Sequence, residues 1–333
     1  MSSNQKIIIH TVGASFRECT EIVDETIPEP GPGQVLVRQH FAGVNGVYDQ
    51  MMCLDRVDHT RVIPPADTGV ESVGIVASVG SRVQQHAVGD AVAVVNVGFG
   101  YRLWQVCDEV DAIPVPAASP EVLALIPSGV SALLALEKTA EMGSGQTVCI
   151  TAAAGGLGNV LTQLAINAGN HVIAVCGGDH KVAALQELGA HRVVNYKKES
   201  LKDVLEADYK DKIDIAMDSV GGALFDTLVD NLAPFGRLVV CGFTSDRVPT
   251  ETVAQERIYT KLYWKAASVR GYMNYRFAEF APAARDRLLQ LYAAGEIRPL
   301  VDDKEFKGLD SVVDAVEYLL AGDNVGKLVV DLR

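Results

Sequence analysis

The first third of the chain consists of short apolar runs separated by glycine and proline turns. One run, residues 35–38, follows the turn Pro30-Gly31-Pro32-Gly33, and further runs at residues 74–80 and 90–95 are bounded by glycine or aspartate. Short apolar runs with this punctuation are typical of strands. Several in succession predict a small β-rich barrel or sandwich.

The pattern changes near Pro127, where buried strand-length runs begin to alternate with helical periodicity. Residues 148–151 read as a strand, 158–168 as a helix, 171–176 as a strand and 179–188 as a helix. Further apolar runs follow at residues 192–194, 213–217 and 236–241. Strands that are apolar throughout are buried on both faces, so this alternation predicts an α/β fold with a doubly wound parallel sheet.

After about residue 270 the alternation stops. Helices are expected at residues 279–294 and 310–320, and a last strand at residues 327–331. This tail is too short for a core of its own, and 333 residues favour two domains over one. We therefore expect residues 1–125 with 270–333 to form the β-rich domain, and residues 126–269 the parallel-sheet domain.

Composition narrows the function classes. The net charge of −13 argues against nucleic acid as a partner. The chain has no run of 18 apolar residues, so we expect no membrane span. The first six residues lack the apolar region of a signal peptide, so a cytoplasmic location is expected. The six cysteines are at least 27 residues apart, which favours small buried side chains over a disulfide framework or a structural zinc lobe.

A glycine-rich loop joins the first parallel strand to its helix. Its sequence is Ala152-Ala153-Ala154-Gly155-Gly156-Leu157-Gly158, with Ala153 at the first position of the G-x-G-x-x-G pattern. Such a loop brings backbone N–H groups and a helix N-terminus to a pyrophosphate. We expect Ala154, Gly155, Gly156 and Leu157 to contact a dinucleotide; the alternative is a plain tight turn.

The end of the second parallel strand indicates which dinucleotide is bound. Cys176-Gly177-Gly178 carries no acid that would bind a ribose 2′-hydroxyl, and Asp179 is expected to be the N-cap of the next helix. Lys181 in the first turn offers a cation to a 2′-phosphate. NADP(H) is therefore the expected cofactor, with Gly177 and Lys181 at its phosphate; the alternative is that Lys181 is only a solvated lysine.

The order of elements and the glycine loop resemble the medium-chain dehydrogenase/reductase superfamily. Residues 218–222, 241–245 and 322–330 are similar to its zinc-independent quinone oxidoreductase branch, and residues 195–197 and 261–271 to one reductase subfamily within it. The resemblance implies a Rossmann domain and a GroES-like catalytic and substrate domain. It also implies further cofactor contacts: Tyr196 at the 2′-phosphate, Ser219 near the adenine, Phe243 and Thr244 beside the nicotinamide, and Asn324 over the ribose or carboxamide.

The chain departs from this branch in the first domain. Gly43-Val44-Asn45-Gly46-Val47-Tyr48-Asp49 is one residue longer than the usual run, and Val70 stands where zinc-dependent relatives carry a histidine ligand. Cys53 alone cannot hold zinc, so no metal is expected, and Glu71 is interpreted as structural. The histidines, His59 among them, lie in no partnered motif and are expected to be structural or solvated.

Without a metal, hydride transfer needs a carbon that is already electrophilic. We expect NADPH-dependent reduction of the C=C bond of α,β-unsaturated carbonyl compounds, with hydride delivered to the β-carbon. Asn45 is the best side-chain candidate for a donor to the carbonyl oxygen, with a ribose hydroxyl or a backbone N–H as alternatives. The α-carbon would take its proton from Tyr48, with water, Tyr263, Tyr272 and Tyr275 as the other candidates. The alternatives are a quinone oxidoreductase and a nucleotide-binding protein without turnover.

An aromatic and methionine-rich set of side chains predicts an apolar substrate pocket. The candidates are Met51, Tyr101, Tyr263, Tyr272 and Met273. The alternative for the part around residues 263–273 is subunit packing, because residues 268–271 read as an edge strand that could pair in a homodimer.

Overall fold

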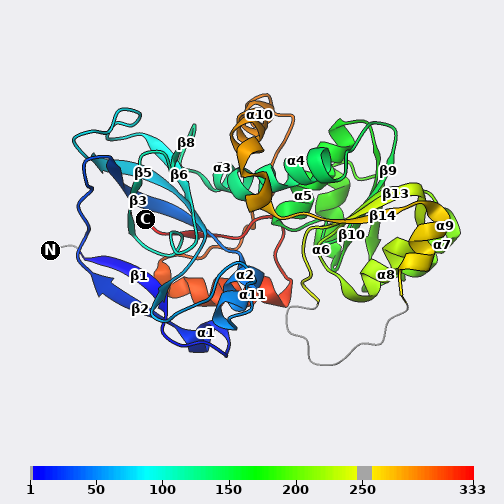
Figure 1. Cartoon of the computed structure of the whole chain (residues 1–333), viewed down its shortest axis with the longest axis horizontal. Helices are drawn as coiled ribbons and strands as arrows, with labels where there is room; N and C mark the ends of the chain where they lie inside the picture. The colour runs from blue at the N-terminus through cyan, green and yellow to red at the C-terminus, as the bar shows by residue number, and fades with distance from the viewer. Residues whose placement is uncertain (1–2, 246–256) are drawn as a thin grey trace. The chain divides into compact units, whose positions relative to one another are not determined.

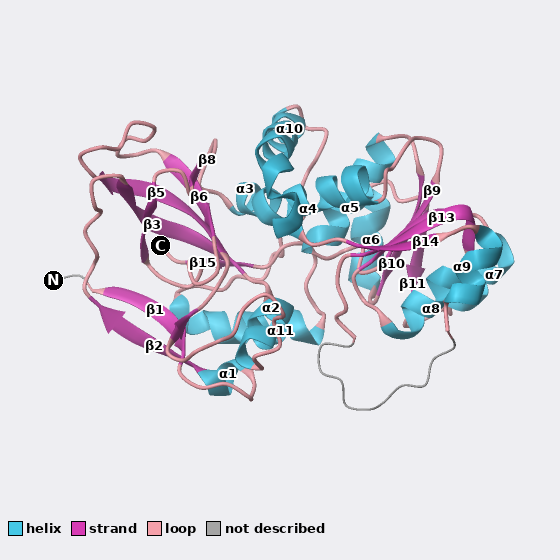
Figure 2. Cartoon of the chain, in the orientation of Figure 1, coloured by secondary structure: helices cyan, strands magenta, loops and turns pink. Residues whose placement is uncertain are grey.

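The protein is described by a computed structural model that covers residues 3–245 and 257–333. The chain divides into two compact units. Unit 1 contains residues 1–127 and 301–333, and unit 2 contains residues 128–300. Figure 1 traces both along the chain, and Figure 2 shows that the N-terminal part is rich in strands.

Unit 1 is built on two antiparallel sheets. The smaller has the order β2-β1-β4, and the larger has the order β15-β3-β5-β6-β8 with β7 also paired to β3. The pairing of β3 with β5 contains two register shifts, or β-bulges, which bend the larger sheet. The sheet curls over a valine-rich core. The strands are β1 (Asn4–Ile9), β2 (Thr20–Glu25), β3 (Gln34–Gly43), β4 (Ala66–Asp67), β5 (Glu71–Val79), β6 (Ala91–Val95), β7 (Trp104–Asp108), β8 (Ala112–Pro114) and β15 (Val329–Asp331).

A second core of unit 1 joins the small sheet to its helices. Ile7 and Ile9 of β1 pack with Phe16 and with Val312 and Val316 of the C-terminal helix. The helices are α1 (Phe16–Cys19), α2 (Gly46–Cys53), α3 (Pro120–Ala124), the 3₁₀ turn η4 (Leu309–Ser311) and α11 (Val312–Ala321). The predicted barrel-like β-rich domain is confirmed.

Unit 2 is a doubly wound α/β unit. Its six strands are parallel and have the order β11-β10-β9-β12-β13-β14, the 3-2-1-4-5-6 order of a Rossmann fold. The predicted Rossmann domain is therefore confirmed. The strands are β9 (Thr147–Ile150), β10 (His171–Cys176), β11 (Arg192–Asn195), β12 (Ile213–Asp218), β13 (Leu232–Val240) and β14 (Ser268–Gly271).

The helices of unit 2 connect and cover these strands. They are α4 (Val130–Leu134), η2 (Ala135–Thr139), α5 (Gly156–Asn167), α6 (Asp179–Glu187), α7 (Leu201–Asp208), α8 (Gly222–Asp230), α9 (Tyr259–Lys265), the 3₁₀ segment η3 (Asn274–Phe280) and α10 (Ala281–Ala293). Before them, the π-helical turn η1 (Leu125–Gly129) continues α3 into α4. Of the described helices, the continuous segment Pro120–Thr139 is long and apolar enough to cross a membrane, but 72% of it is buried inside the protein, as in a core helix.

The second boundary differs from the expected one. Residues 270–300 belong to unit 2, whereas only residues 301–333 return to unit 1. The Gln163 side chain of α5 donates to the Arg298 carbonyl (3.0 Å) and accepts from the Arg298 N–H (2.8 Å), and Asn159 accepts from the Leu300 N–H (3.0 Å). These buried amides bind the segment after α10 to the Rossmann unit, and the sequence pattern carried no sign of them.

Candidate functional site

The loop between β9 and α5 has the geometry of a phosphate cradle. Gly155 is the N-cap of α5, and the amide of Asn159 donates to the carbonyls of Gly155 and Gly156 at 2.8 and 2.9 Å. A Cβ on Gly158 would lie 2.2 Å from the Ala152 oxygen, so only glycine lets the helix approach the loop this closely. The free N–H groups of the first helical turn suit the pyrophosphate of a dinucleotide.

A buried carboxylate links this loop to the end of β12. Asp218 accepts a hydrogen bond from the Thr151 hydroxyl at 2.6 Å and from the backbone N–H groups of Val220 and Gly221. The Ser219 N–H donates to the Thr151 oxygen (2.9 Å), and the Thr244 N–H donates to the Ser219 carbonyl (3.2 Å). The structure therefore brings together Ser219 and Thr244, and Phe243 beside them is 46% exposed.

The turn after β10 and the end of β11 also meet. Tyr196 bonds through its backbone N–H to the Cys176 carbonyl (3.0 Å), and its phenol lies over Gly177, where a Cβ would be 2.4 Å from the hydroxyl oxygen. Lys181 lies in the first turn of α6, which begins beside this pair. Gly177, Lys181 and Tyr196 thus lie at one corner of unit 2.

Asp179 is not the N-cap that the sequence suggested. Gly178 holds that position with φ 158°, and Asp179 begins the helix. Its carboxylate accepts from Lys198 at 2.6 Å and from Asn195 at 3.1 Å, and these bonds lower its pKa, the Lys198 bond most of all. The acid nearest this corner is therefore already paired with a cation, which reduces its repulsion of a phosphate.

In unit 1, Asn45 is held by a buried ion pair. The Asn45 amide nitrogen donates to Glu71 Oε1 at 2.8 Å, and its oxygen accepts from Lys327 Nζ at 3.0 Å. Glu71 and Lys327 form an ion pair, and their side chains are 0% and 3% exposed. The amide cannot turn over without losing both bonds, so the orientation of Asn45 is fixed. Sequence reasoning missed Lys327, although a lysine at the start of the apolar run 327–330 indicates a charge close to the core.

Asp49 lies beside this pair in the same unit. Its carboxylate accepts from the Tyr101 hydroxyl at 2.7 Å and from the Asn45 N–H at 3.2 Å. Burial raises the pKa of Asp49 to about 6, although the Tyr101 bond works in the opposite direction. Tyr101, expected to line a substrate pocket, is 1% exposed and has its hydroxyl on Asp49, so the structure places it in the core.

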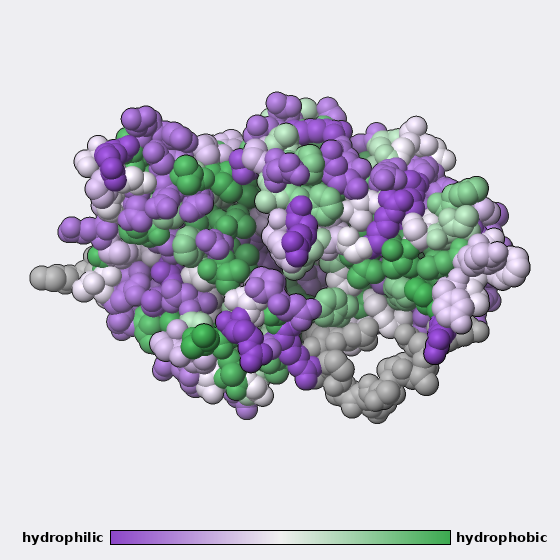
Figure 3. Space-filling model, in the orientation of Figure 1, coloured by the Kyte–Doolittle hydropathy of each residue, from purple (hydrophilic) through white to green (hydrophobic). Residues whose placement is uncertain are grey.

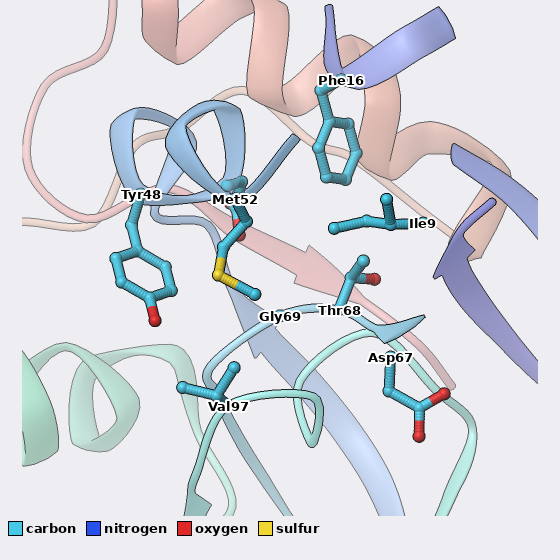
Figure 4. A pocket seen from close by; sticks show the side chains of 9 residues that line it. Ile9, Phe16, Tyr48, Met52, Asp67, Thr68, Gly69 and Val97 are labelled. Carbon is cyan, nitrogen blue, oxygen red and sulfur yellow. The ribbon is translucent and has the colours of Figure 1, made fainter. Parts of the chain in front are cut away.

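A pocket of unit 1 opens between α2 and the turn around Gly69. Tyr48 and Met52 project into it from α2, on the side where Val97 lies (Figure 4). The other lining residues are Ile9, Phe16, Asp49, Asp67, Thr68 and Gly69. Apolar and polar side chains share the lining, and the Tyr48 phenol is one of its polar groups. Met51, the expected pocket residue, packs against the core of the unit, and its neighbour Met52 lines the pocket.

The Tyr48 phenol has a partner that sequence reasoning missed. Its hydroxyl lies 3.2 Å from Nε2 of His59, and the two rings are stacked with centroids 6.0 Å apart. Burial, and the charge of Asp49, raise the pKa of Tyr48. The phenol therefore stays protonated at neutral pH, the state that a proton donor needs.

The remaining candidates belong to several elements of the two units. In unit 2, Tyr263 is 75% exposed on α9, Met273 is 43% exposed, and Tyr272 stacks on Phe277. Asn324, expected at the cofactor, belongs to unit 1, is 9% exposed and donates to the Gly326 carbonyl at 2.8 Å. Among the residues that the structure describes, no three His, Cys, Asp or Glu side chains are grouped to hold a metal ion.

A Rossmann unit with a glycine cradle and a second, β-rich unit define a dinucleotide-binding oxidoreductase of two units. The family model described as "Zinc-binding dehydrogenase" matches residues 156–289, and "Alcohol dehydrogenase GroES-like domain" matches residues 31–124. Prostaglandin reductase-3 of Mus musculus is 40% identical, covering 98% of this chain and 89% of that protein. A probable quinone oxidoreductase of Leishmania amazonensis is 32% identical, covering 100% of this chain and 99% of that protein.

The fold agrees with these relatives. A structure of Escherichia coli quinone oxidoreductase complexed with NADPH superposes with a TM-score of 0.83 at 24% identity, covering 98% of this chain and 99% of that one. The chain belongs to the quinone oxidoreductase branch of the medium-chain dehydrogenase/reductase superfamily, and it is an oxidoreductase. The expected family, and within it the similarity to prostaglandin reductase-3, are confirmed.

Proposed function

We propose that the protein uses NADP(H) to reduce the C=C bond of α,β-unsaturated carbonyl compounds without zinc. The observation that carries this proposal is a neutral phenol, Tyr48, in a pocket of unit 1 whose lining also contains the apolar side chains of Phe16 and Met52. Reduction of a C=C bond ends with protonation of a carbon atom, which needs a positioned acid. A quinone receives its protons on oxygen and has no such need.

The residues of unit 2 fit the cofactor. The first turn of α5 would hold the pyrophosphate, with Gly158 permitting the close approach, and Lys181 and Tyr196 would hold the 2′-phosphate. When bound, the cofactor supplies a hydride for the β-carbon of the substrate.

The residues of unit 1 have distinct tasks. Glu71 accepts one N–H of the Asn45 amide, and the second N–H is the group that would donate to the carbonyl oxygen of the substrate. Negative charge develops on that oxygen during reduction, so a donor held in place beforehand lowers the barrier. Tyr48 then donates its proton to the α-carbon, and Ile9, Phe16 and Met52 exclude water from the pocket.

The test follows the label from deuterated NADPH. With an enone, deuterium is expected at the β-carbon, and a saturated ketone or a primary alcohol is expected to give no turnover. Asn45→Ala is expected to lower kcat more than it changes KM, because the bond to oxygen strengthens in the transition state. Label at the carbonyl carbon would contradict the proposal. So would a semiquinone signal with quinones and no enone turnover, or NADPH binding with no turnover of either class.

We further propose that two copies pair through the edge of the Rossmann sheet, in the cytoplasm. Strand β14 pairs only with β13 in the described sheet, and on α9 beside it Tyr263 and Trp264 are 75% and 82% exposed. Apolar surface gathers around β14 and α8 on the face shown in Figure 3. Light scattering is expected to give twice the chain mass, and a monomer at micromolar concentration would contradict the pairing.

A further inference from the structure

Tyr48 needs a route by which its hydroxyl regains a proton after each turnover. The phenol lines the pocket and is half-buried, whereas His59, in the segment after α2, is exposed. The 3.2 Å contact between Tyr48 Oη and His59 Nε2 therefore joins a group inside the pocket to a group in contact with water. This arrangement is that of a proton relay.

We propose that His59 returns protons from solvent to Tyr48 during the reduction of conjugated C=C bonds. This inference rests on the proposed function. After hydride addition to the β-carbon, the Tyr48 O–H bond breaks and a C–H bond forms at the α-carbon. The phenolate oxygen then takes the Nε2 proton of His59, and water restores a proton to the imidazole ring. Three proton transfers follow one another, one proton is taken from solvent in total, and neither side chain changes its oxidation state.

The neighbouring acid cannot serve as this route. The charge of Asp49 contributes to the raised pKa of the phenol, but Asp49 is 3% exposed, and its carboxylate accepts from the Tyr101 hydroxyl and the Asn45 N–H. Burial also disfavours its charged form. A proton that left Asp49 would have to be replaced through the same pocket, whereas His59 faces water directly.

The relay predicts a difference between substrate classes. Carbon takes up protons slowly and depends on a positioned acid, so an enone should need Tyr48 and its resupply. The oxygens of a reduced quinone exchange protons with water rapidly, so quinone turnover should not depend on His59. This contrast separates a proton relay from a structural role, which would affect both substrates alike.

The experiment compares His59→Gln and His59→Ala with the wild-type enzyme, using NADPH with an enone and with a quinone. For the enone, kcat is expected to fall at least 10-fold, the solvent deuterium isotope effect on kcat to increase, and free imidazole to restore much of the rate of His59→Ala. For the quinone, kcat should stay within twofold. His10→Gln, an exposed histidine of the same unit, is the matched control and should leave both rates unchanged.

A second measurement needs no turnover. The imidazole resonances of His59 in NMR spectra at one fixed pH should move in Tyr48→Phe, because the contact with the phenol is lost, and should stay in place in His10→Gln. The relay is overturned if the wild type reduces enones while His59→Gln keeps its kcat, or if kcat falls equally for both substrates without imidazole rescue. Unaltered His59 resonances in Tyr48→Phe also overturn it. A wild-type enzyme that reduces no enone overturns the proposed function itself, and the relay with it.

Discussion

Replacing Lys327 by methionine should destabilise unit 1 far more than replacing an exposed cation of the same unit. The Lys327 ammonium has three acceptors: Glu71, the Asn45 oxygen at 3.0 Å and the Val44 carbonyl at 3.2 Å. Methionine fills a similar volume but supplies none of these bonds. Among the described residues, the Glu71 carboxylate, 0% exposed, would keep only the Asn45 amide as a side-chain donor.

The magnitude follows from this burial. Removing one partner of a buried ion pair leaves an uncompensated charge and costs about 3–5 kcal/mol of the free energy of unfolding. With a urea m-value of about 2 kcal/mol/M, the unfolding midpoint of unit 1 should fall by about 1.5–2.5 M. Replacing Glu71 and Lys327 together by methionine removes both charges, so the double variant should be more stable than Lys327→Met alone.

The chain offers a reporter and a matched control. It contains two tryptophans, Trp104 in unit 1 and Trp264 in unit 2, so Trp264→Phe leaves a fluorescence signal that reports unit 1 alone. Arg17 bridges Asp314 and Glu317 at the surface, at 2.6 and 2.7 Å, where water screens the charges. Arg17→Met should therefore shift the midpoint only slightly. Equal shifts for the two single variants, or a double variant less stable than Lys327→Met, would refute the reasoning.

Three further outcomes are expected. Lys181→Ala should weaken NADPH binding by about 1–3 kcal/mol in calorimetric titration and leave NADH nearly unchanged, because only NADPH carries the 2′-phosphate; equal losses would remove Lys181 from that site. The raised pKa of Asp49 stabilises the fold below about pH 4, and this contribution is lost as the pH rises through about 6, so Asp49→Asn should flatten the pH dependence of urea unfolding in that range by up to ~1.4 kcal/mol per pH unit. Dialysis against a strong chelator should leave enone reduction intact, and activity that returned only with zinc would show a metal-dependent enzyme.

Local patterns predicted much of the fold. The β-rich unit, the parallel sheet and the glycine loop follow from hydrophobic periodicity and punctuation within windows of a few residues. The position of Asp179 was missed by one residue, because Gly178 takes the N-cap and Lys198 from beyond β11 binds the carboxylate. That bond is set by the parallel pairing of β10 with β11, which no window around Asp179 contains.

The candidate site was predicted less completely, because its contacts join distant parts of the chain. Glu71 reads as a structural residue until Lys327, 256 positions later, is placed against it. His59 reads as a solvated histidine until the turn after α2 folds back on Tyr48. In both cases the residue types were visible in the sequence, while the pairing depends on the tertiary fold.

The interrupted layout of unit 1 also bears on how the protein is made. On the ribosome, residues 1–127 emerge first, but β15, which pairs with β3, and Lys327 follow only after all of unit 2. At about 5–20 residues per second, roughly 10–40 s separate the end of the first segment from the end of the chain. Unit 2, being contiguous, has what it needs to fold during that interval. A nascent chain stopped near residue 300 would contain all of unit 2 but only the first segment of unit 1. In that segment, the Phe41–Gly43 edge of β3 would lack its pairing with β15, and Glu71 would lack the Lys327 cation.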